Sequence, residues 1–337
     1  MSGTRGPGAH GIAGVLAALA LCADLGLAHL HARQPKFFPD DPLLREPDTQ
    51  DASGVKAWDI PLGYDLAVNL FSTPGTVRDI RALDVNTVDE VPDSSWFTNR
   101  IGSVPISIEA LQRGPVRSPG PAPGRLTVVR AKSSGVTPGF VLRDSVGVVW
   151  FVQFNAPSNP EGASAASMIA NRLFWALGYF QAENHIATIR VDELDIDPRA
   201  RVETPSGRER PLDMDDLKVI LGHADRAPDF TYRMLASRAI PGRILGGFKY
   251  HGTRPDDPND VIPHEHRRVL RALKVFGAWT NLVDMKAGNT LDSLITEDGR
   301  SFVRHYLQDV GSTFGVGALG PREWDEGYEY IFEAPRC

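Results

Sequence analysis

The sequence predicts an α+β protein made of two lobes and preceded by an N-terminal extension. A hairpin-rich stretch that begins at Leu126 runs into a long amphipathic helix, residues 164–178, and then into a further strand. A second apolar-periodic helix begins near Leu270 and leads through a polar loop into another hairpin. The chain has 337 residues, of which 42% are hydrophobic and 23% charged, which suits two packed globular units.

Residues 1–32 are predicted to be an export signal. Arg5 is the only charged residue before an apolar run at 12–21, and Ala18-Leu19-Ala20 has the small-residue pattern of a cleavage site. Asp24 ends the apolar run too early for a good transmembrane span. We therefore expect an exported protein, periplasmic or secreted, with no transmembrane span in the mature chain. A disordered alanine-rich tail is the alternative.

The two cysteines and the overall charge narrow the class of protein further. A lipid anchor at Cys22 is less favoured than a soluble mature form, because Leu21 stands where lipoprotein signals need a small residue. After cleavage only Cys337 remains, so no internal disulfide can form and the core must hold the fold. The net charge of −6 and the absence of a basic run exclude nucleic acid as an expected partner.

Residues 33–124 are predicted to form an ordered N-terminal extension that ends in a Pro/Gly-rich linker at 114–124. A short helix is expected at 64–71. The aromatic residues expected to anchor the extension on the main domain are Phe37, Phe38, Trp58 and Tyr64. The acidic stretch 86–100, NTVDEVPDSSWFTNR, is interpreted as turn residues around a buried Trp96 and Phe97. Binding of a metal or a basic partner by these acids is the alternative.

The small lobe is expected at residues 125–192. Its predicted elements are strands at 126–130, 140–143 and 148–154, the helix at 164–178, and a strand at 186–190. The loop between the first two strands contains Gly135 and Gly139, and Lys132 stands at its entrance.

The large lobe is expected at residues 193–337. A charged hairpin at 192–211 leads into it, and propensity leaves residues 232–237 open between helix and strand. The helix near Leu270 is predicted to bury a wide stripe formed by Leu270, Leu273, Val275, Phe276, Ala278 and Trp279. Strands are expected at 290–294 and 302–307, with a turn at Asp298-Gly299.

The loop after this helix reads Asp284-Met-Lys286-Ala-Gly-Asn289, and the last strand ends in Asp309-Val-Gly311. This order of helix, D-x-K-x-x-N loop, hairpin and D-x-G resembles the catalytic loop and the later D-F-G motif of protein kinases. The chain is similar to an atypical branch of the protein-kinase-like superfamily, distantly similar to toxin-kinase and spore-coat-kinase branches. The phrase DEVPDSSWFTNR extends the likeness to a group of exported bacterial proteins.

The resemblance implies a role for each of these residues in phosphoryl transfer from ATP. Asp284 would take the proton of the acceptor hydroxyl, and Lys286 would place a positive charge near the transferred phosphoryl group. Asn289 and Asp309 would be the ligands of Mg²⁺ or Mn²⁺. The structural alternative is that Asp284 and Asn289 cap turns and that Asp309 begins a surface loop.

The small lobe departs from the kinase pattern at both ends of one ion pair. The resemblance implies nucleotide contacts from Lys132, Gly135, Gly139 and the third strand, but Gln153 stands where kinases carry a phosphate-binding lysine. The helix at 164–178 also lacks the glutamate that would pair with such a lysine. Lys132 could substitute for it. Two functions follow: an ATP-dependent phosphotransferase or nucleotide binder with an unknown protein or envelope acceptor, or a pseudokinase that acts as an envelope scaffold.

Two other patterns are rejected as functional sites. His264-Glu265-His266 lacks the H-E-x-x-H spacing that places two histidines on one face of a helix, and it is interpreted as a helix start. The glycines at 315–320 fit G-x-G-x-x-G, but Pro321 follows at once and too little chain remains for a strand-helix-strand unit.

Overall fold

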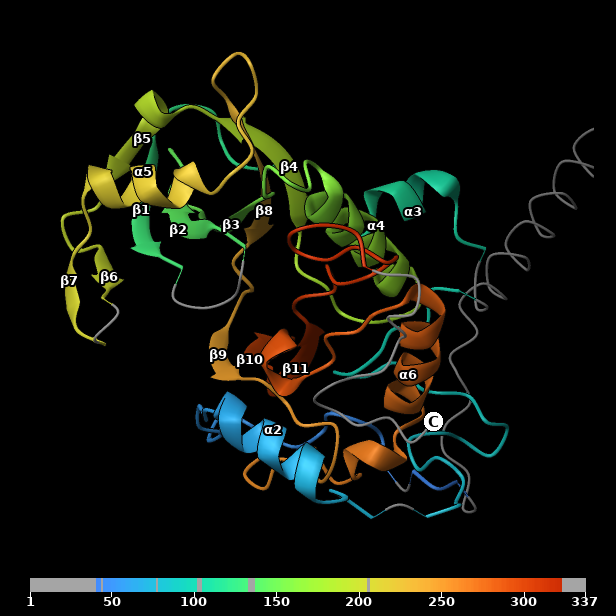
Figure 1. Cartoon of the computed structure of the whole chain (residues 1–337). Helices are drawn as coiled ribbons and strands as arrows, with labels where there is room; N and C mark the ends of the chain where they lie inside the picture. Colours follow the sequence, from blue (N-terminus) through green and yellow to red (C-terminus); the bar gives the residue numbers. More distant parts are fainter. Residues whose placement is uncertain are drawn as a thin grey trace, which may run out of the picture.

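The computed structural model describes residues 41–43, 45–76, 78–101, 105–132, 137–204 and 207–322. Over these residues the protein is mixed α+β, with a six-stranded sheet, a three-stranded sheet and a two-stranded ribbon (Figure 1). The α+β class is therefore confirmed. The predicted export signal with Cys22, together with Phe37, Phe38, Gly135 and Cys337, lies outside the described residues.

The larger sheet has the strand order β4-β8-β3-β2-β1-β5. All neighbours are antiparallel except β1 and β5, which are parallel. Its strands are β1 (Leu126–Ala131), β2 (Gly139–Arg143), β3 (Val149–Phe154), β4 (Asn184–Ile189), β5 (Leu194–Ile196) and β8 (Tyr232–Arg238). The segment that propensity left open is thus strand β8. It pairs with β3 and β4, although Tyr232 lies 43 positions after Ile189 at the end of β4.

Two helices pack near this sheet, and each buries one side. α5 (Met214–Gly222) adds Leu217 and Leu221 to the core on one face of the sheet, and its first turn is fixed by a capping box between Asp213 and Asp216. α4 (Gly162–Ala176) buries Ala170 and Phe174 in a second core, shared with the rest of the chain. The ribbon of β6 (Arg201–Glu203) and β7 (Glu209–Pro211) projects from the sheet (Figure 1). No helix in the described ranges is long and apolar enough to cross a membrane.

The smaller sheet has the order β11-β10-β9 and carries the predicted hairpin. Its strands are β9 (Arg243–Gly246), β10 (Thr290–Glu297) and β11 (Arg300–Leu307). The turn residues Asp298 and Gly299 both have positive φ, 49° and 75°, which suits the twist of a two-residue hairpin loop. The predicted hairpin is therefore confirmed, with strands somewhat longer than expected.

The helix before the hairpin, α6 (Arg268–Thr280), buries a narrower stripe than the sequence predicts. Val275 and Trp279 are 67% and 70% exposed, so their predicted burial is wrong. The buried residues are Val269, Leu270, Leu273, Gly277 and Thr280. Asn281 then ends the helix in the left-handed conformation, with φ of 54°. Short 3₁₀ turns lie before and after α6, at His264–His266 and Ala287–Asn289, and another lies at Val191–Glu193.

The N-terminal segment includes α2 (Leu62–Phe71) and α3 (Ile108–Arg113), and it is packed into the main core. The ring of Trp96 stacks on His305, with centroids 3.5 Å apart, and meets Phe248 edge-on. Trp58 donates a hydrogen bond to the Gly247 carbonyl at 2.8 Å. The predicted burial of Trp96 is confirmed. Tyr64, by contrast, is 60% exposed, and its ring lies beside the Lys249 ammonium.

Buried ion pairs surround the Trp96 ring. Asp292 accepts from Arg254 at 3.1 Å and from His305 at 2.7 Å, and all three side chains are almost fully buried. Asp260 accepts from Arg267 Nη2 at 2.7 Å, and the Arg267 guanidinium lies 4.6 Å from the Trp96 ring centre. Because buried charges are costly unless they are paired, these contacts couple the position of the indole to that of the acids.

Truncation of the Trp96 side chain should destabilise the whole fold. Trp96→Ala is expected to lower the free energy of unfolding by about 3–5 kcal/mol, because it leaves a cavity in the core and uncovers His305 and Arg267. Trp279→Ala is the matched control, with an effect within about 0.5 kcal/mol because that side chain faces solvent. Urea unfolding followed by circular dichroism measures both, and equal losses for the two variants would contradict the assignment.

The buried carboxylate should matter more than an exposed one. Asp292→Asn is expected to cost about 3 kcal/mol of unfolding free energy, since it leaves the Arg254 charge without its buried partner. Asp195→Asn, which breaks the exposed pair with Arg125, should cost less than about 1 kcal/mol. The same urea titration measures both variants. An Asp292→Asn variant as stable as the wild type would show that the buried Asp292–Arg254 pair contributes little to stability.

Candidate functional site

The loop after α6 is closed by contacts among the predicted residues themselves. Lys286 Nζ lies 2.8 Å from Asp284 Oδ1, and both side chains are partly exposed. Asn289 Nδ2 donates to the backbone oxygen of Asp284 at 2.6 Å, which closes the loop over its 3₁₀ turn. The loop therefore presents a carboxylate, an ammonium and an amide from one short segment.

The Asp309-Val310-Gly311 segment is joined directly to this loop. The backbone oxygen of Asn289 accepts from the amides of Gln308, at 2.9 Å, and Asp309, at 3.1 Å. Asp309 Oδ1 accepts from the Gly311 amide at 2.9 Å, and the side chain is exposed. Asp284, Lys286, Asn289 and Asp309 are thus brought together by the end of the hairpin.

Lys132 reaches the same region from the other sheet. It follows β1, and its Nζ donates to Thr137 Oγ1 at 2.7 Å and to the Thr137 backbone oxygen at 3.1 Å. Burial lowers the pKa of the Lys132 ammonium, and the negative charge of Asp309 partly opposes that shift. The ammonium of the six-stranded sheet and the carboxylate after β11 therefore act on each other electrostatically.

Gly139 and Gln153 face each other on β2 and β3. A Cβ at Gly139 would lie 2.3 Å from the Val152 backbone oxygen, so the close approach of the two strands by itself requires glycine here. The Gln153 side chain lines a small cavity together with Thr137 and Ser164. A neighbouring cavity of about 210 Å³ is lined by Lys132, Thr137, Gly139 and residues of α5. Thr137 borders both cavities.

Helix α4 approaches the Asp309 segment through a small residue. A Cβ on Gly311 would come within 2.4 Å of Ser167 Oγ, so a larger residue here would require the serine side chain to move. Ser167 itself donates to the Ala163 backbone oxygen at 2.9 Å. Sequence reasoning did not find the roles of Thr137 and Ser167, because small hydroxyl residues give no signal until their neighbours are known.

The donor set near Asp309 fits a divalent cation held partly by phosphate. The Asp309 carboxylate and the Asn289 amide oxygen belong to adjoining segments, and Asn289 uses its amide nitrogen for the loop contact. Mg²⁺ commonly takes one or two carboxylates and completes its shell with water and substrate phosphates. Among the described residues no group of three or more His, Cys, Asp or Glu side chains forms a cation cage. A site made by the chain alone is therefore not seen in these ranges.

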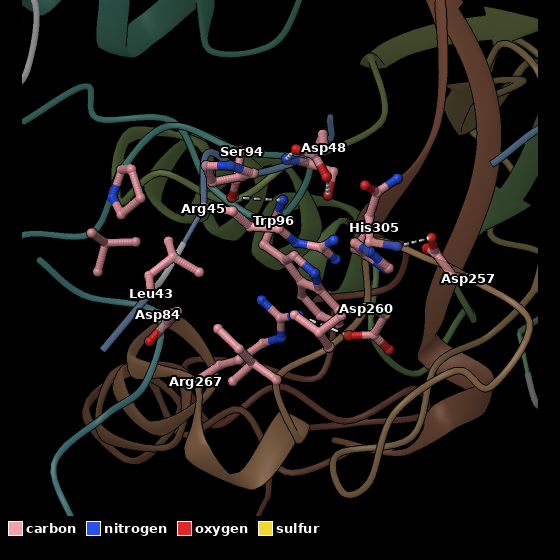
Figure 2. Close-up of a pocket in the computed structure, with 17 residues that line it drawn as sticks. Leu43, Arg45, Asp48, Asp84, Ser94, Trp96, Asp257, Asp260, Arg267 and His305 are labelled. Atoms are coloured by element: carbon pink, nitrogen blue, oxygen red, sulfur yellow. Dashed lines mark hydrogen bonds and ion pairs between the residues drawn. The ribbon is translucent and has the colours of Figure 1, made fainter. Parts of the chain in front are cut away.

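A further hollow, beside Trp96, has a different character (Figure 2). Its volume is about 30 Å³, too small for a nucleotide. The acids around it are engaged locally: Asp48 accepts from the Ser95 amide at 2.6 Å, and Asp260 accepts from His264 Nε2 at 2.8 Å. We interpret this hollow as the seam where the N-terminal segment docks. His264 is therefore a structural residue of this seam.

The residues that the sequence singled out therefore fall into two described groups, one in the loop and hairpin end and one on β1–β3, and Gly135 lies outside the described residues. Lys132 and Asp309 join the two sheets, Asp284, Lys286 and Asn289 form the adjoining loop, and Gln153 lines the next cavity. No family model matches the chain, and comparisons with curated proteins and with solved structures likewise find no match.

Proposed function

We propose that the protein is an exported kinase-like protein that binds ATP with Mg²⁺ or Mn²⁺ and is a candidate phosphotransferase with an unknown acceptor. The observation that carries the proposal is the grouping of Asp284, Lys286, Asn289 and Asp309 at the end of the hairpin. The negative charge of Asp309 also acts on the Lys132 ammonium. A cation beside a glycine-containing loop and a carboxylate beside an amide are the two groups that nucleotide phosphates and their metal require. They follow strands of two separate sheets, and the proposal is that both bind the same nucleotide.

The order of elements supports a kinase-like, two-lobed arrangement. Three antiparallel strands, helix α4 and strand β4 precede α6, its polar loop, the hairpin and the Asp309 segment. The chain departs from the simplest form of this order, because β5, the β6-β7 ribbon and α5 are inserted between β4 and β8. Since β8 pairs with β3 and β4, the insertion leaves the sheet continuous.

Lys132 is proposed to replace the missing strand lysine. Its side chain is half-buried and donates to Thr137 Oγ1, and no carboxylate of the described residues lies within ion-pair distance of it. An ammonium group has three donors, so a phosphate oxygen could take the place of a Thr137 oxygen without leaving the charge unsolvated. Gln153 in the adjoining cavity can add a hydrogen bond but no charge.

The loop residues are proposed to act on the acceptor. Asp284 would accept the proton of an incoming hydroxyl, and Lys286, 2.8 Å from its carboxylate, would place a positive charge near the transferred phosphoryl group. When bound, the metal would neutralise phosphate charge beside Asn289 and Asp309. The residues of the chain bind and orient the nucleotide and receive one proton.

The alternative function is a pseudokinase that serves as an envelope scaffold. Two observations favour it. Ser167 of α4 packs against Gly311, and β3 carries Gln153 in place of a lysine. A small residue at this contact leaves no carboxylate to orient a strand lysine. Such a protein would bind a partner, with or without nucleotide, and would transfer no phosphoryl group.

Nucleotide binding should depend on both ends of the Lys132–Asp309 contact. In a thermal-shift titration of the mature chain, ATP with Mg²⁺ or Mn²⁺ is expected to stabilise the protein, by about 2.7 kcal/mol at a hundred times the dissociation constant. Asp309→Ala and Lys132→Met should each weaken binding about tenfold or more, because each removes a charge that faces the phosphates.

Matched controls keep this test specific. Asp59→Ala and Lys218→Met remove exposed charges outside the site and should leave the shift unchanged. If the wild-type chain shows no shift at millimolar nucleotide, the binding proposal fails and the scaffold function is favoured.

Phosphoryl transfer is tested separately with γ-labelled ATP. If the protein is a phosphotransferase, label should enter the protein or an added envelope fraction, and Asp284→Asn should slow transfer about 100-fold or more while nucleotide binding persists. Glu297→Gln, at the far end of the hairpin, is the control for a carboxylate change on the same sheet. Binding without any transfer would favour the pseudokinase.

A further inference from the structure

A second large cavity lies away from the Lys132–Asp309 region. It has a volume of about 350 Å³ and lies where the end of α4, the end of β8 and the turn of the β10-β11 hairpin come together. Glu297 lines it near the hairpin turn, whereas Asp309 follows the opposite end of β11. The cavity lining runs along β11 as far as Tyr306, and Asp309 is not among the lining residues.

Four arginines line this cavity, and two glutamates neutralise only part of their charge. Arg304 forms a two-point ion pair with Glu297, with both nitrogen–oxygen distances 2.8 Å. Arg238 lies 3.2 Å from Glu183, which also accepts from Ser118 Oγ.

Arg100 and Arg117 form no ion pair with a carboxylate in the part of the chain that the structure describes, so the lining carries a formal surplus of two positive charges. Arg100 is held in the wall by backbone oxygens: its Nη1 donates to Trp175 at 2.6 Å and to Tyr179 at 3.2 Å. Burial, with smaller contributions from Arg117 and Arg304, lowers the pKa of Arg100 to about 10, and the negative charge of Asp93 partly opposes that shift. Arg100 therefore stays charged at neutral pH.

Two buried hydrogen-bond donors in the lining have no acceptor among the described residues. Gln181 is 7% exposed, and its Nε2 has no hydrogen-bond partner there, while its Oε1 accepts from Asn171 Nδ2 at 3.2 Å. Arg304 Nε is also buried without a partner in these ranges. Buried donors are nearly always satisfied, so these two mark a place where an acceptor from outside the chain would be stabilised.

Aromatic rings hold the guanidinium groups and form the apolar part of the wall. Arg100 lies 4.8 Å from the Trp175 ring centre, and Arg304 lies 4.7 Å from that of Phe180. Such stacking fixes the plane of a guanidinium and leaves its edge available for hydrogen bonds. Tyr306, which shares a face of β11 with Arg304, completes this side.

We propose that this cavity binds a phosphate monoester dianion that carries a small apolar or aromatic group. A phosphate monoester has a charge between about −1.5 and −2 at neutral pH, which matches the surplus of two positive charges. Its oxygens can accept from several arginine edges and from the Gln181 amide at once. The aromatic wall accommodates the organic group. The site is separate from the proposed nucleotide site.

The test is isothermal titration of the mature chain with phenyl phosphate, inorganic phosphate and benzoate. Phenyl phosphate is expected to bind more tightly than inorganic phosphate, which lacks the ring, and than benzoate, which has one charge. Arg117→Gln should weaken binding of phenyl phosphate about tenfold, because it removes one charged donor at an exposed position. Arg113→Gln, an exposed arginine of α3 outside the lining, is the matched control and should bind as the wild type does.

Two more variants test whether phenyl phosphate binds in this cavity and not at the nucleotide site. Gln181→Glu replaces the unpartnered donor with a carboxylate and should abolish measurable binding, with circular dichroism as the check that the variant is folded. Asp309→Ala should leave the affinity for phenyl phosphate unchanged, because Asp309 does not line the cavity. The proposal is overturned if no probe binds saturably, if Arg117→Gln binds like wild type, if benzoate binds as tightly as phenyl phosphate, or if Asp309→Ala removes binding.

Discussion

The structure depends on the burial of one indole between charged groups that are already paired. Trp96 comes from the N-terminal segment and stacks on His305 of β11, while Arg267 lies over the ring from the start of α6. The His305 ring is hydrogen-bonded to the buried Asp292 carboxylate, and the Arg267 guanidinium is paired with the buried Asp260 carboxylate. If the indole were withdrawn, water would reach ion pairs that are stable only because their geometry is fixed. The N-terminal segment is therefore part of the core, and it sets the position of the hairpin.

Strand β11 of the hairpin connects the Trp96 core to both candidate sites. Side chains alternate along β11, so His305 and Leu307 face the Trp96 core while Arg304 and Tyr306 line the arginine-rich cavity. The strand then ends beside the Asn289 oxygen, which binds the Asp309 amide. A single strand thus fixes the carboxylate of the proposed nucleotide site and part of the proposed phosphate site, and a shift in its register would disturb both.

The charged residues are distributed unevenly over the molecule, and the net charge does not describe the individual cavities. The chain as a whole carries −6, yet the lining of one cavity has a surplus of positive charge, and another cavity is lined by the half-buried Lys132. Net charge describes average interactions with large polyanions, whereas a small anion responds to the few groups within several ångströms. The exclusion of nucleic acid as an expected partner and the proposal of phosphate ligands are therefore compatible.

The sequence by itself determined the features that depend on neighbours along the chain. The Asp298-Gly299 turn, the helix at α4 and the order of loop, hairpin and D-x-G are local, so residue type and spacing suffice. Only the tertiary structure decided which of these residues meet. Strand β8 pairs with β3 and β4. Val275 and Trp279 are exposed to solvent because no described element covers that side of α6. The charge of Asp309 acts on Lys132, which lies 177 positions earlier in the chain. The reason is physical. Burial and charge pairing depend on packing between distant segments, and the residue pattern of one segment does not show which segment packs against it.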